Sequence, residues 1–260
     1  MDDQQRKALN WFQELRSQVW NIWQQHEPGY YTAVPHTWEK GQYNILKGKH
    51  YEKAGVAWSN VEGLLPAQMS LLAGKPFWSS GTSVVIHPSN PHVPGMHFNT
   101  RFITTEDERW FGGGMDITPY VYEPEILTWY RKELKEMCDF HDVKYYPKFS
   151  KDCDEYFHLH HRDEPRGAGG IFFDYMSDDY ENTFRFIQDV GRTFITVMTK
   201  LVQENKHKGF TEEERNDQLV KRGRYVEFNL LHDKGTRFGL ESGGNVNAIL
   251  MSMPPDARWE

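Results

Sequence analysis

Four short segments alternate apolar and polar residues and are separated from one another by glycine and proline. They cover residues 56–61, 83–87, 97–104 and 115–120. Successive side chains of a strand point to opposite faces, so this pattern predicts four β-strands with one buried face each. Short links between such strands favour antiparallel pairing, and a parallel β-α-β order is the weaker alternative. A largely antiparallel sheet is therefore the centre of the expected fold.

Apolar residues recur at steps of three and four in five other segments, which predicts amphipathic helices. The predicted helices cover residues 4–26, 124–140, 148–162, 179–205 and 211–220. With the strands, they predict an α+β fold in which helices flank the sheet on both faces.

The remaining segments carry weaker patterns. Alternation returns near the end of the chain and predicts three more strands, at residues 224–232, 236–240 and 247–253. Residues 27–51 are rich in Gly, Pro and Tyr without a sustained period, and we expect a long loop with one short strand there. The 260 residues fit one hydrophobic core, so we expect a single domain over residues 1–260 with an N-terminal helix and loop in residues 1–50.

Charge and composition narrow the classes of partner and compartment. The net charge of −7 argues against nucleic acid, which needs a concentrated basic face. No apolar stretch approaches the roughly 20 residues that span a bilayer, so we expect no membrane span. The only cysteines are Cys138 and Cys153, which suits a reducing compartment, and we expect the cytoplasm. An anionic small molecule remains a suitable ligand.

Two neighbouring predicted strands carry polar side chains on one face. Alternation places His97, Asn99 and Arg101 together, and the preceding strand places Ser83 and His87 together. The linker between these strands contains three prolines, which restrict its backbone. A rigid polar constellation suits a ligand site, because buried polar groups need partners. A solvated strand face is the alternative, and the pattern alone leaves both open.

The run from Lys221 to Lys234 combines cations with one carboxylate. Lys221, Arg222 and Arg224 precede Asp233, which is followed directly by Lys234. The cations are suited to clamping ligand carboxylates, and Asp233 to acting as a base or binding an N–H group. A surface ion-pair network is the alternative reading of the same residues.

Glycine-rich runs occur at residues 112–114, 167–170 and 243–244. None has the helix and lysine context of a phosphate-binding loop, so we expect no nucleotide cofactor. These glycines instead predict tight turns or close approach of the backbone to a bulky ligand.

Several of the 12 histidines are candidate metal ligands, but their spacing matches no strong metal motif. The candidates are His87, His97, His160 and His161. Imidazole suits transition metals, yet acid–base or hydrogen-bonding roles are preferred here. A metal site stays open as the alternative.

Four long segments resemble the oxygen-dependent coproporphyrinogen III oxidases, and they occur in that family's order. They are SSGTSVVIHPSNPHVPGMHFNTRF, WFGGGMDITPY, YPKFSKDCDEYFHLHHRDEPRGAGGIFFDY and RGRYVEFNLLHDKGTRFGL. The resemblance runs from about Glu52 to the last residue, and residues 1–50 diverge. It implies an antiparallel sheet flanked by helices, a homodimer, and decarboxylation of two propionates to vinyl groups with O2 and no organic cofactor. The implied product is protoporphyrinogen IX.

The resemblance also implies roles for individual residues. Ser83 matches a substrate contact, and His97 matches the position assigned as proton donor. Asn99 and Arg101 match the substrate-binding Asn-x-Arg. Asp233 matches an aspartate that engages the pyrrole nitrogens, and so joins His97 as an expected catalytic residue.

A divalent metal is implied for some bacterial members of that family. His87 and His161 match positions assigned to metal there, so His87, His97 and His161 form the expected metal set. Those members carry another metal-assigned histidine where this chain has Tyr130. The metal is therefore left open.

The remaining expected substrate-binding positions lie between residues 221 and 245, and some of them depart from the family. They are Lys221, Arg222, Lys234, Gly243, Gly244 and Asn245. Family members carry Arg at the positions of Lys221, Lys234 and Asn245, and Arg binds carboxylates in two-pronged fashion where these residues cannot. The family also commonly continues beyond the match to Glu260, so we expect a shortened chain or a divergent paralogue. The alternatives are an oxygen-using, metal-dependent oxidase or decarboxylase with another substrate, and a non-catalytic tetrapyrrole-binding protein.

Overall fold

One antiparallel sheet runs through the molecule. The computed structural model describes residues 1–27, 29, 31–65, 73–241 and 244–260. Within them, seven strands pair in the order β1-β2-β3-β4-β5-β6-β9, and β7 and β8 form a separate hairpin. The strands are β1 (Thr32–Trp38), β2 (Gly41–Lys47), β3 (Tyr51–Leu64), β4 (Pro76–Pro88), β5 (Gly95–Thr104), β6 (Arg109–Thr118), β7 (His158–Leu159), β8 (Glu164–Pro165) and β9 (Gly170–Met176).

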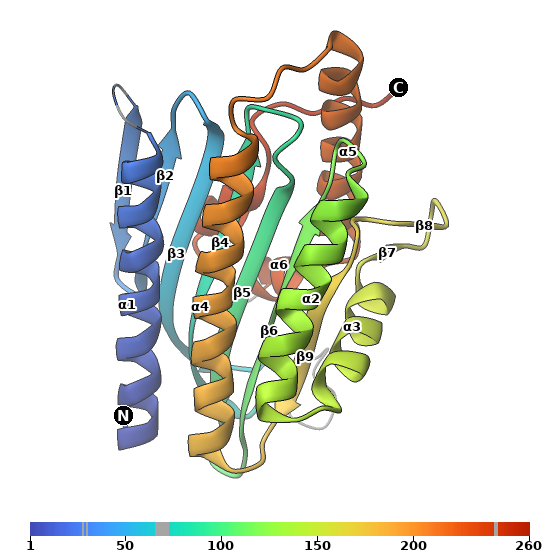
Figure 1. The fold of residues 1–260 in the computed structure, drawn as a ribbon. Helices are drawn as coiled ribbons and strands as arrows, with labels where there is room; N and C mark the ends of the chain where they lie inside the picture. The colour runs from blue at the N-terminus through green and yellow to red at the C-terminus, as the bar shows by residue number, and fades with distance from the viewer. Residues whose placement is uncertain (28, 30, 66–72, 242–243) are drawn as a thin grey trace.

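Helices cover both faces of this sheet, as predicted. The helices are α1 (Asp3–His26), α2 (Pro124–His141), α3 (Tyr145–Tyr156), α4 (Tyr180–Asn205), α5 (Glu212–Leu231), α6 (Lys234–Glu241), α7 (Val246–Ile249) and the 3₁₀ turn η2 (Leu250–Ser252). In Figure 1, α1, α4 and α2 lie side by side in front of the sheet, and α6 lies behind it. The α+β class with an antiparallel sheet is thus confirmed.

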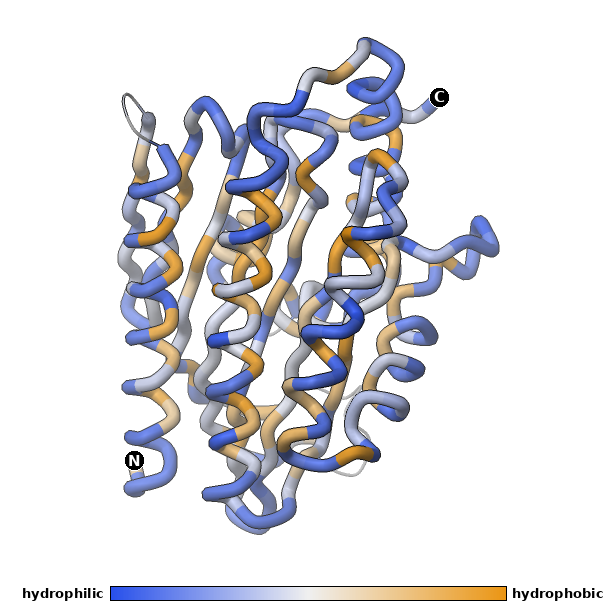
Figure 2. Tube along the Cα trace, in the orientation of Figure 1, coloured by the Kyte–Doolittle hydropathy of each residue, from blue (hydrophilic) through white to orange (hydrophobic). Residues whose placement is uncertain are grey.

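The face under α1 and α4 holds the main apolar core. Phe98 of β5 stacks on Phe194 of α4 with ring centroids 4.8 Å apart, and Thr82 of β4 donates to the carbonyl of Phe12 in α1 at 2.7 Å. Figure 2 shows apolar and polar residues alternating along the turns of both helices, as expected when one stripe of a helix is buried. Core side chains therefore fill this face of the sheet. The polar residues of β4 and β5 lie on the opposite face.

The opposite face carries the predicted polar constellation. The register places Ser83 opposite Asn99 and Val85 opposite His97, so the polar faces of β4 and β5 meet as predicted. Tyr225 of α5 packs on this face, where its ring meets that of His87 edge-on at 5.3 Å. The C-terminal helices thus cover the polar face of the sheet.

The three strands predicted after residue 223 are wrong, because this part of the chain is helical. A capping box between Thr211 and Glu214 starts α5, and its buried stripe includes Leu219, Arg222 and Phe228 at steps of three and six residues. The side chain of Asn245 caps α7 by accepting from the backbone of Ala248. Alternation in this region reflects β-favouring residue types on helices whose packing and caps outweigh propensity.

Other boundaries also differ from the prediction. The helix expected over residues 148–162 ends at Tyr156 and is followed by the β7–β8 hairpin, where Asp163 has a positive φ of 54°. Residues 27–51, expected to hold one short strand, contain β1 and β2. No helix in the described residues is long and apolar enough to cross a membrane.

Candidate active site on one face of the sheet

The polar row begins at His97, whose ring is held by a buried carboxylate. His97 Nδ1 lies 2.9 Å from Asp116 Oδ1 on the neighbouring strand β6. The other oxygen, Asp116 Oδ2, accepts a hydrogen bond from Arg166, which follows β8. Arg166 is itself buried, and its guanidinium carbon lies 3.9 Å from the centroid of the Phe157 ring. Buried Arg166 therefore holds the Asp116 carboxylate in place, and Asp116 in turn orients the His97 ring.

Electrostatics determine which nitrogen of His97 is available. Burial alone would raise the pKa of Asp116, but the charge of Arg166 and the hydrogen bond from His97 outweigh it and hold this pKa below its ordinary value. An ionised carboxylate can only accept, so His97 Nδ1 carries the proton that it donates to Asp116. His97 Nε2 is then the atom that takes up or gives a proton. This is the arrangement that general acid–base catalysis requires.

The row continues from His97 to an arginine at the open end. Asn99 Nδ2 lies 3.4 Å from His97 Nε2, and Arg101 Nη1 lies 3.4 Å from Asn99 Oδ1. Arg101 also donates from Nη2 to Asp174 Oδ2 of β9 at 2.7 Å. The Arg101 side chain is 31% exposed, so its guanidinium is accessible to a ligand carboxylate. The sheet thus aligns an acid–base group with an anion-binding group.

Small residues lie beside the row. Ser83 is half-buried opposite Asn99, and Gly112 lies opposite Arg101. A Cβ atom at Gly112 would lie 2.3 Å from Asp174 Oδ1 and 3.0 Å from Arg101 Nη2. A side chain at this position would therefore displace the Asp174 carboxylate and the Arg101 guanidinium from their present positions.

An open cavity of about 460 Å³ adjoins the row at β9. Its lining residues are Lys148, Asp152, Glu155, Tyr156, His160, Phe172, Asp174, His232 and Lys234. The rings of Tyr156 and Phe172 stack with centroids 4.2 Å apart and planes at 9°. A flat aromatic surface suits a flat ligand, and the polar lining combines two lysines with the carboxylates of Asp152, Glu155 and Asp174. Lys234, predicted as a substrate contact, lies here.

Asp233 lies close to this cavity, but its carboxylate already has several partners. Tyr156 donates its hydroxyl to Asp233 Oδ1 at 2.9 Å. The backbone N–H and the hydroxyl of Thr236 both donate to Asp233 Oδ2, at 2.7 and 2.8 Å. Asp233 therefore caps the start of α6 and fixes the Tyr156 ring.

Two of the predicted carboxylate clamps are committed elsewhere and need correction. Arg222 is fully buried at 0% exposure and pairs with Glu52 at 2.9 Å. Lys221 donates to the backbone carbonyls of Pro119 and Tyr120 at 2.7 and 3.1 Å. Arg222 was expected just before a strand, but it lies on α5 and points into the protein. These two cations link α5 to the rest of the fold and are not presented to a ligand.

The predicted glycine-asparagine contacts lie at the link between α6 and α7. Gly243 lies outside the described residues. Gly244 donates its backbone N–H to the carbonyl of Gly239 at 2.9 Å, and Asn245 Oδ1 accepts from the backbone of Ala248 at 3.1 Å. The described contacts of this segment are those of a helix cap.

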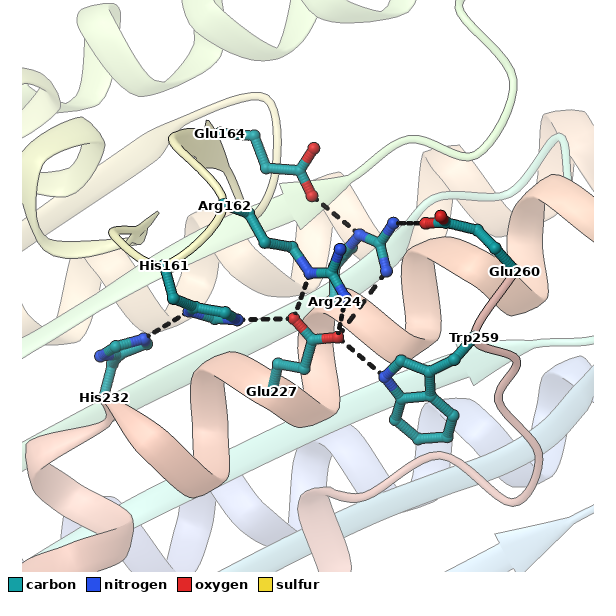
Figure 3. A network of polar contacts seen from close by, with 8 residues as sticks. All are labelled: His161, Arg162, Glu164, Arg224, Glu227, His232, Trp259 and Glu260. Atoms are coloured by element: carbon teal, nitrogen blue, oxygen red, sulfur yellow. Dashed lines mark hydrogen bonds and ion pairs between the residues drawn. The ribbon is translucent and has the colours of Figure 1, made fainter.

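The three predicted metal ligands do not come together. His87 Nε2 lies 2.8 Å from the carbonyl oxygen of Ser252, so this nitrogen donates and has no lone pair for a metal. His97 Nδ1 is held by a carboxylate, and His161 belongs to a separate network (Figure 3). In the part of the chain that the structure describes, no three His, Cys, Asp or Glu side chains gather closely enough to hold a metal ion. The donor set does not fit a metal.

The network that contains His161 is centred on Glu227 of α5 (Figure 3). Arg162 donates to Glu227 from Nε and Nη2 at 2.5 and 2.7 Å, and His161 and Trp259 contribute further hydrogen bonds. These contacts lower the pKa of Glu227 to about 2, with the Arg162 hydrogen bonds as the largest cause. Because Glu227 is only 12% exposed, this carboxylate ties the β7–β8 hairpin and the C-terminal segment to α5.

Asp116 and Arg166 were not among the predicted site residues. Both lie in segments that carry the family resemblance, and Asp116 falls within a predicted strand. The missing information was strand pairing, which places Asp116 directly opposite His97. A carboxylate on the strand paired with a candidate histidine is the signal that would have identified it.

Fold and site together point to a class of protein. An oriented histidine, a partly exposed arginine and a flat aromatic cavity on one face of an antiparallel sheet are the groups that an acid–base enzyme acting on a flat, carboxylate-bearing ligand would need.

Comparison with known proteins specifies this class further. The family model described as coproporphyrinogen III oxidase matches residues 7–260. The chain is 44% identical to the oxygen-dependent coproporphyrinogen-III oxidase of Rickettsia bellii (strain RML369-C), with 96% of each chain covered. It is 42% identical to that of Rickettsia rickettsii (strain Sheila Smith), again with 96% of each covered. The chain therefore belongs to the coproporphyrinogen III oxidase family.

Proposed function

We propose that this protein uses O2 to decarboxylate two propionate side chains of coproporphyrinogen III to vinyl groups, giving protoporphyrinogen IX in porphyrin and haem biosynthesis. The observation that carries the proposal is the chain of contacts from Arg166 through Asp116 to His97, which continues to Asn99 and Arg101. Family membership supplies the substrate, and this geometry supplies the acid–base and carboxylate-binding groups.

The atom balance explains why an acid is needed. The propionate carboxylate leaves as CO2, and the carbon β to it loses hydrogen, so that a vinyl group forms with release of two electrons and one proton. O2 takes up two electrons and two protons and becomes hydrogen peroxide. Each propionate therefore consumes one proton, which His97 Nε2 is placed to supply. The porphyrinogen provides the electrons, so no organic cofactor is required.

The remaining residues of the site hold the substrate. Arg101 and Asn99 bind a substrate carboxylate, and Ser83 contacts the macrocycle above the small residues of the sheet. Lys234 binds another carboxylate at the open cavity. Asp233 positions the Tyr156 ring rather than meeting the substrate directly, since its oxygens accept three hydrogen bonds within the protein.

An assay of the purified protein with coproporphyrinogen, in air and under argon, tests the proposal. We expect a product that has lost two CO2 and four hydrogens, formed only in air and read by porphyrin fluorescence and mass. Binding without turnover would instead identify a tetrapyrrole-binding protein. Turnover of another substrate alone would identify a paralogue, and a chelator that abolishes it would indicate a metal-dependent one.

We infer that the protein acts as a homodimer in the cytoplasm. Exposed apolar residues lie on the successive helices α5, α6 and α7, which contact one another: Leu230, Leu231, Leu240 and Val246 are 49%, 56%, 40% and 53% exposed. Exposed apolar side chains on neighbouring helices are typical of a contact surface between protein chains. Cys138 and Cys153 are both buried and unpaired, which suits a reducing compartment.

A further inference from the structure

A small cavity lies behind the acid–base pair. It is bounded by β4, β5, β6 and α5, and its lining includes His87, Gly95, His97, Asp116 and Tyr225. Gly95 and Arg101 lie on opposite sides of His97 along β5, so this cavity is on the far side of the histidine from the arginine. The proposed substrate site therefore does not account for it.

The size of the cavity matches one water molecule. It offers about 10 Å³ to the centre of a water-sized sphere. That is about the space that a single buried water requires, and it is too small for an organic ligand.

Two residues that line the cavity have polar atoms with unused hydrogen-bonding capacity. His87 Nδ1 has no partner, and the Tyr225 hydroxyl, whose oxygen the Asn229 side chain approaches as a donor, has no acceptor for its own proton. The two residues are 2% and 6% exposed. Because His87 Nε2 donates to Ser252, Nδ1 is an acceptor that needs a donor. Buried polar groups of folded proteins almost always have partners.

The Asp116 carboxylate offers a water molecule in this cavity a third hydrogen-bond partner. Its two oxygens accept hydrogen bonds from His97 and Arg166, and a carboxylate can accept further ones. A water in the cavity has a donor in the Tyr225 hydroxyl and acceptors in His87 Nδ1 and Asp116. This gives about three hydrogen bonds, the usual number for a buried water.

We propose that the cavity binds one ordered water molecule, and that Tyr225 and His87 act through this water as positioning residues for the Asp116–His97 pair. The catalytic consequence rests on the proposed function, whereas the water site rests on the geometry alone. An apolar occupant such as O2 would leave His87 Nδ1 and the Tyr225 hydroxyl proton without partners, so water is the occupant that the lining favours.

High-resolution crystal structures of the wild-type protein and of Tyr225→Phe test the site itself. The substitution removes the hydroxyl but keeps the ring, which packs 5.3 Å from the His87 ring and 4.9 Å from the Arg166 guanidinium. We expect density within hydrogen-bond distance of the Tyr225 hydroxyl and His87 Nδ1 in the wild type, and its loss in the variant. An empty cavity in the wild type, or one that takes up xenon under pressure, would overturn the proposal.

Steady-state kinetics of the same variant test the positioning role. We expect Tyr225→Phe to lower kcat roughly tenfold and to change KM less than about twofold, because the water acts on the acid–base pair and not on substrate binding. The control is Tyr180→Phe, which removes a hydroxyl that donates to the Gln4 carbonyl on the other side of the sheet, and its kcat should match the wild type.

The outcomes separate this inference from the proposed function. An unchanged kcat in Tyr225→Phe after loss of the water would overturn the positioning role. A wild-type protein that holds the water but converts no coproporphyrinogen would contradict the proposed function and still support the water site.

Discussion

The Asp116 carboxylate connects the buried Arg166 with His97 of the polar row. It is 4% exposed and accepts from both. A buried ion pair stabilises a fold only modestly, but loss of one partner leaves the other charge uncompensated. The pair is therefore better explained by the orientation that it gives His97 than by stability.

Substitution of Asp116 by Asn keeps the shape of the side chain and removes its charge. We expect Asp116→Asn to lower kcat by about 10²-fold or more. Asn has one acceptor oxygen for two donors, His97 and Arg166, and when Arg166 takes the oxygen the amide N–H faces His97 Nδ1 and no longer fixes its protonated form. The uncompensated charge of Arg166 should also destabilise the fold by about 3–5 kcal/mol. Kinetics on the folded fraction and urea unfolding measure both effects. Asp107→Asn is the control, since Asp107 forms an exposed pair with Lys75. Wild-type kcat in Asp116→Asn would contradict this account.

Glu227 provides a test at low pH. The pKa of Glu227 is lowered to about 2 from an ordinary value of 4.5, so its contribution to stability is present above pH 4.5 and is lost as the pH falls towards 2. We expect Glu227→Gln to lower the urea midpoint at pH 6, and the difference from the wild type to shrink by pH 3. Glu136→Gln serves as the control, because its pair with Lys132 is exposed. A difference that stays constant with pH would argue against the network.

At the scale of elements, alternation predicted the central strands well. In β4 and β5, polar and apolar residues occupy opposite faces, and the register brings Ser83 opposite Asn99 as expected. Here one face packs against a large core and the other carries the site, so the pattern in the sequence reports burial directly.

The same reasoning failed after residue 223 for a physical reason. The segment from Tyr225 to Asp233 alternates, but the helix started by the Thr211 cap continues to Leu231. It buries Tyr225 beside His87 of the sheet and Phe228 beside Phe157. Which residues face the sheet depends on contacts far apart in the chain, such as that of Tyr225 with His87. Arg222 was misassigned as a clamp, and Asp116 was missed, because both depend on such contacts.

Strand β6 offers a prediction about its glycines. A Cβ at Gly112 would lie 2.3 Å from Asp174 Oδ1, so Gly112→Ala should disrupt the Arg101–Asp174 pair. We expect KM to rise about tenfold, corresponding to loss of one charge-assisted hydrogen bond. Gly209→Ala is the matched control, because a Cβ there meets nothing within 4 Å. An unchanged KM in Gly112→Ala would show that this pair does not shape the carboxylate site.

At the scale of the molecule, the two ends of the chain pack on opposite faces of the same strands. The first helix meets β4 through Phe12 and Thr82, and Met251 near the C-terminus packs on Gly55 of β3. Because both ends depend on one sheet, we expect one cooperative unfolding transition, with circular dichroism and Trp fluorescence superimposed. Two separated transitions would indicate independent domains.

The proposed dimer belongs to the same scale. We expect sedimentation to give twice the mass of the chain, and Leu231→Asp to shift the protein to monomers, because a carboxylate would be buried at the contact. Phe140→Asp is the control, since Phe140 is also exposed but lies on α2, away from the C-terminal helices. A dimer that survives Leu231→Asp would place the interface elsewhere.

The most direct test of the central claim is a crystal structure with coproporphyrin, the oxidised and unreactive form of the proposed substrate. The account predicts that the macrocycle lies over Ser83 and Asn99, with one propionate hydrogen-bonded to Arg101 and another side chain within reach of His97 Nε2. A macrocycle bound away from this face, with Arg101 still paired only to Asp174, would contradict it.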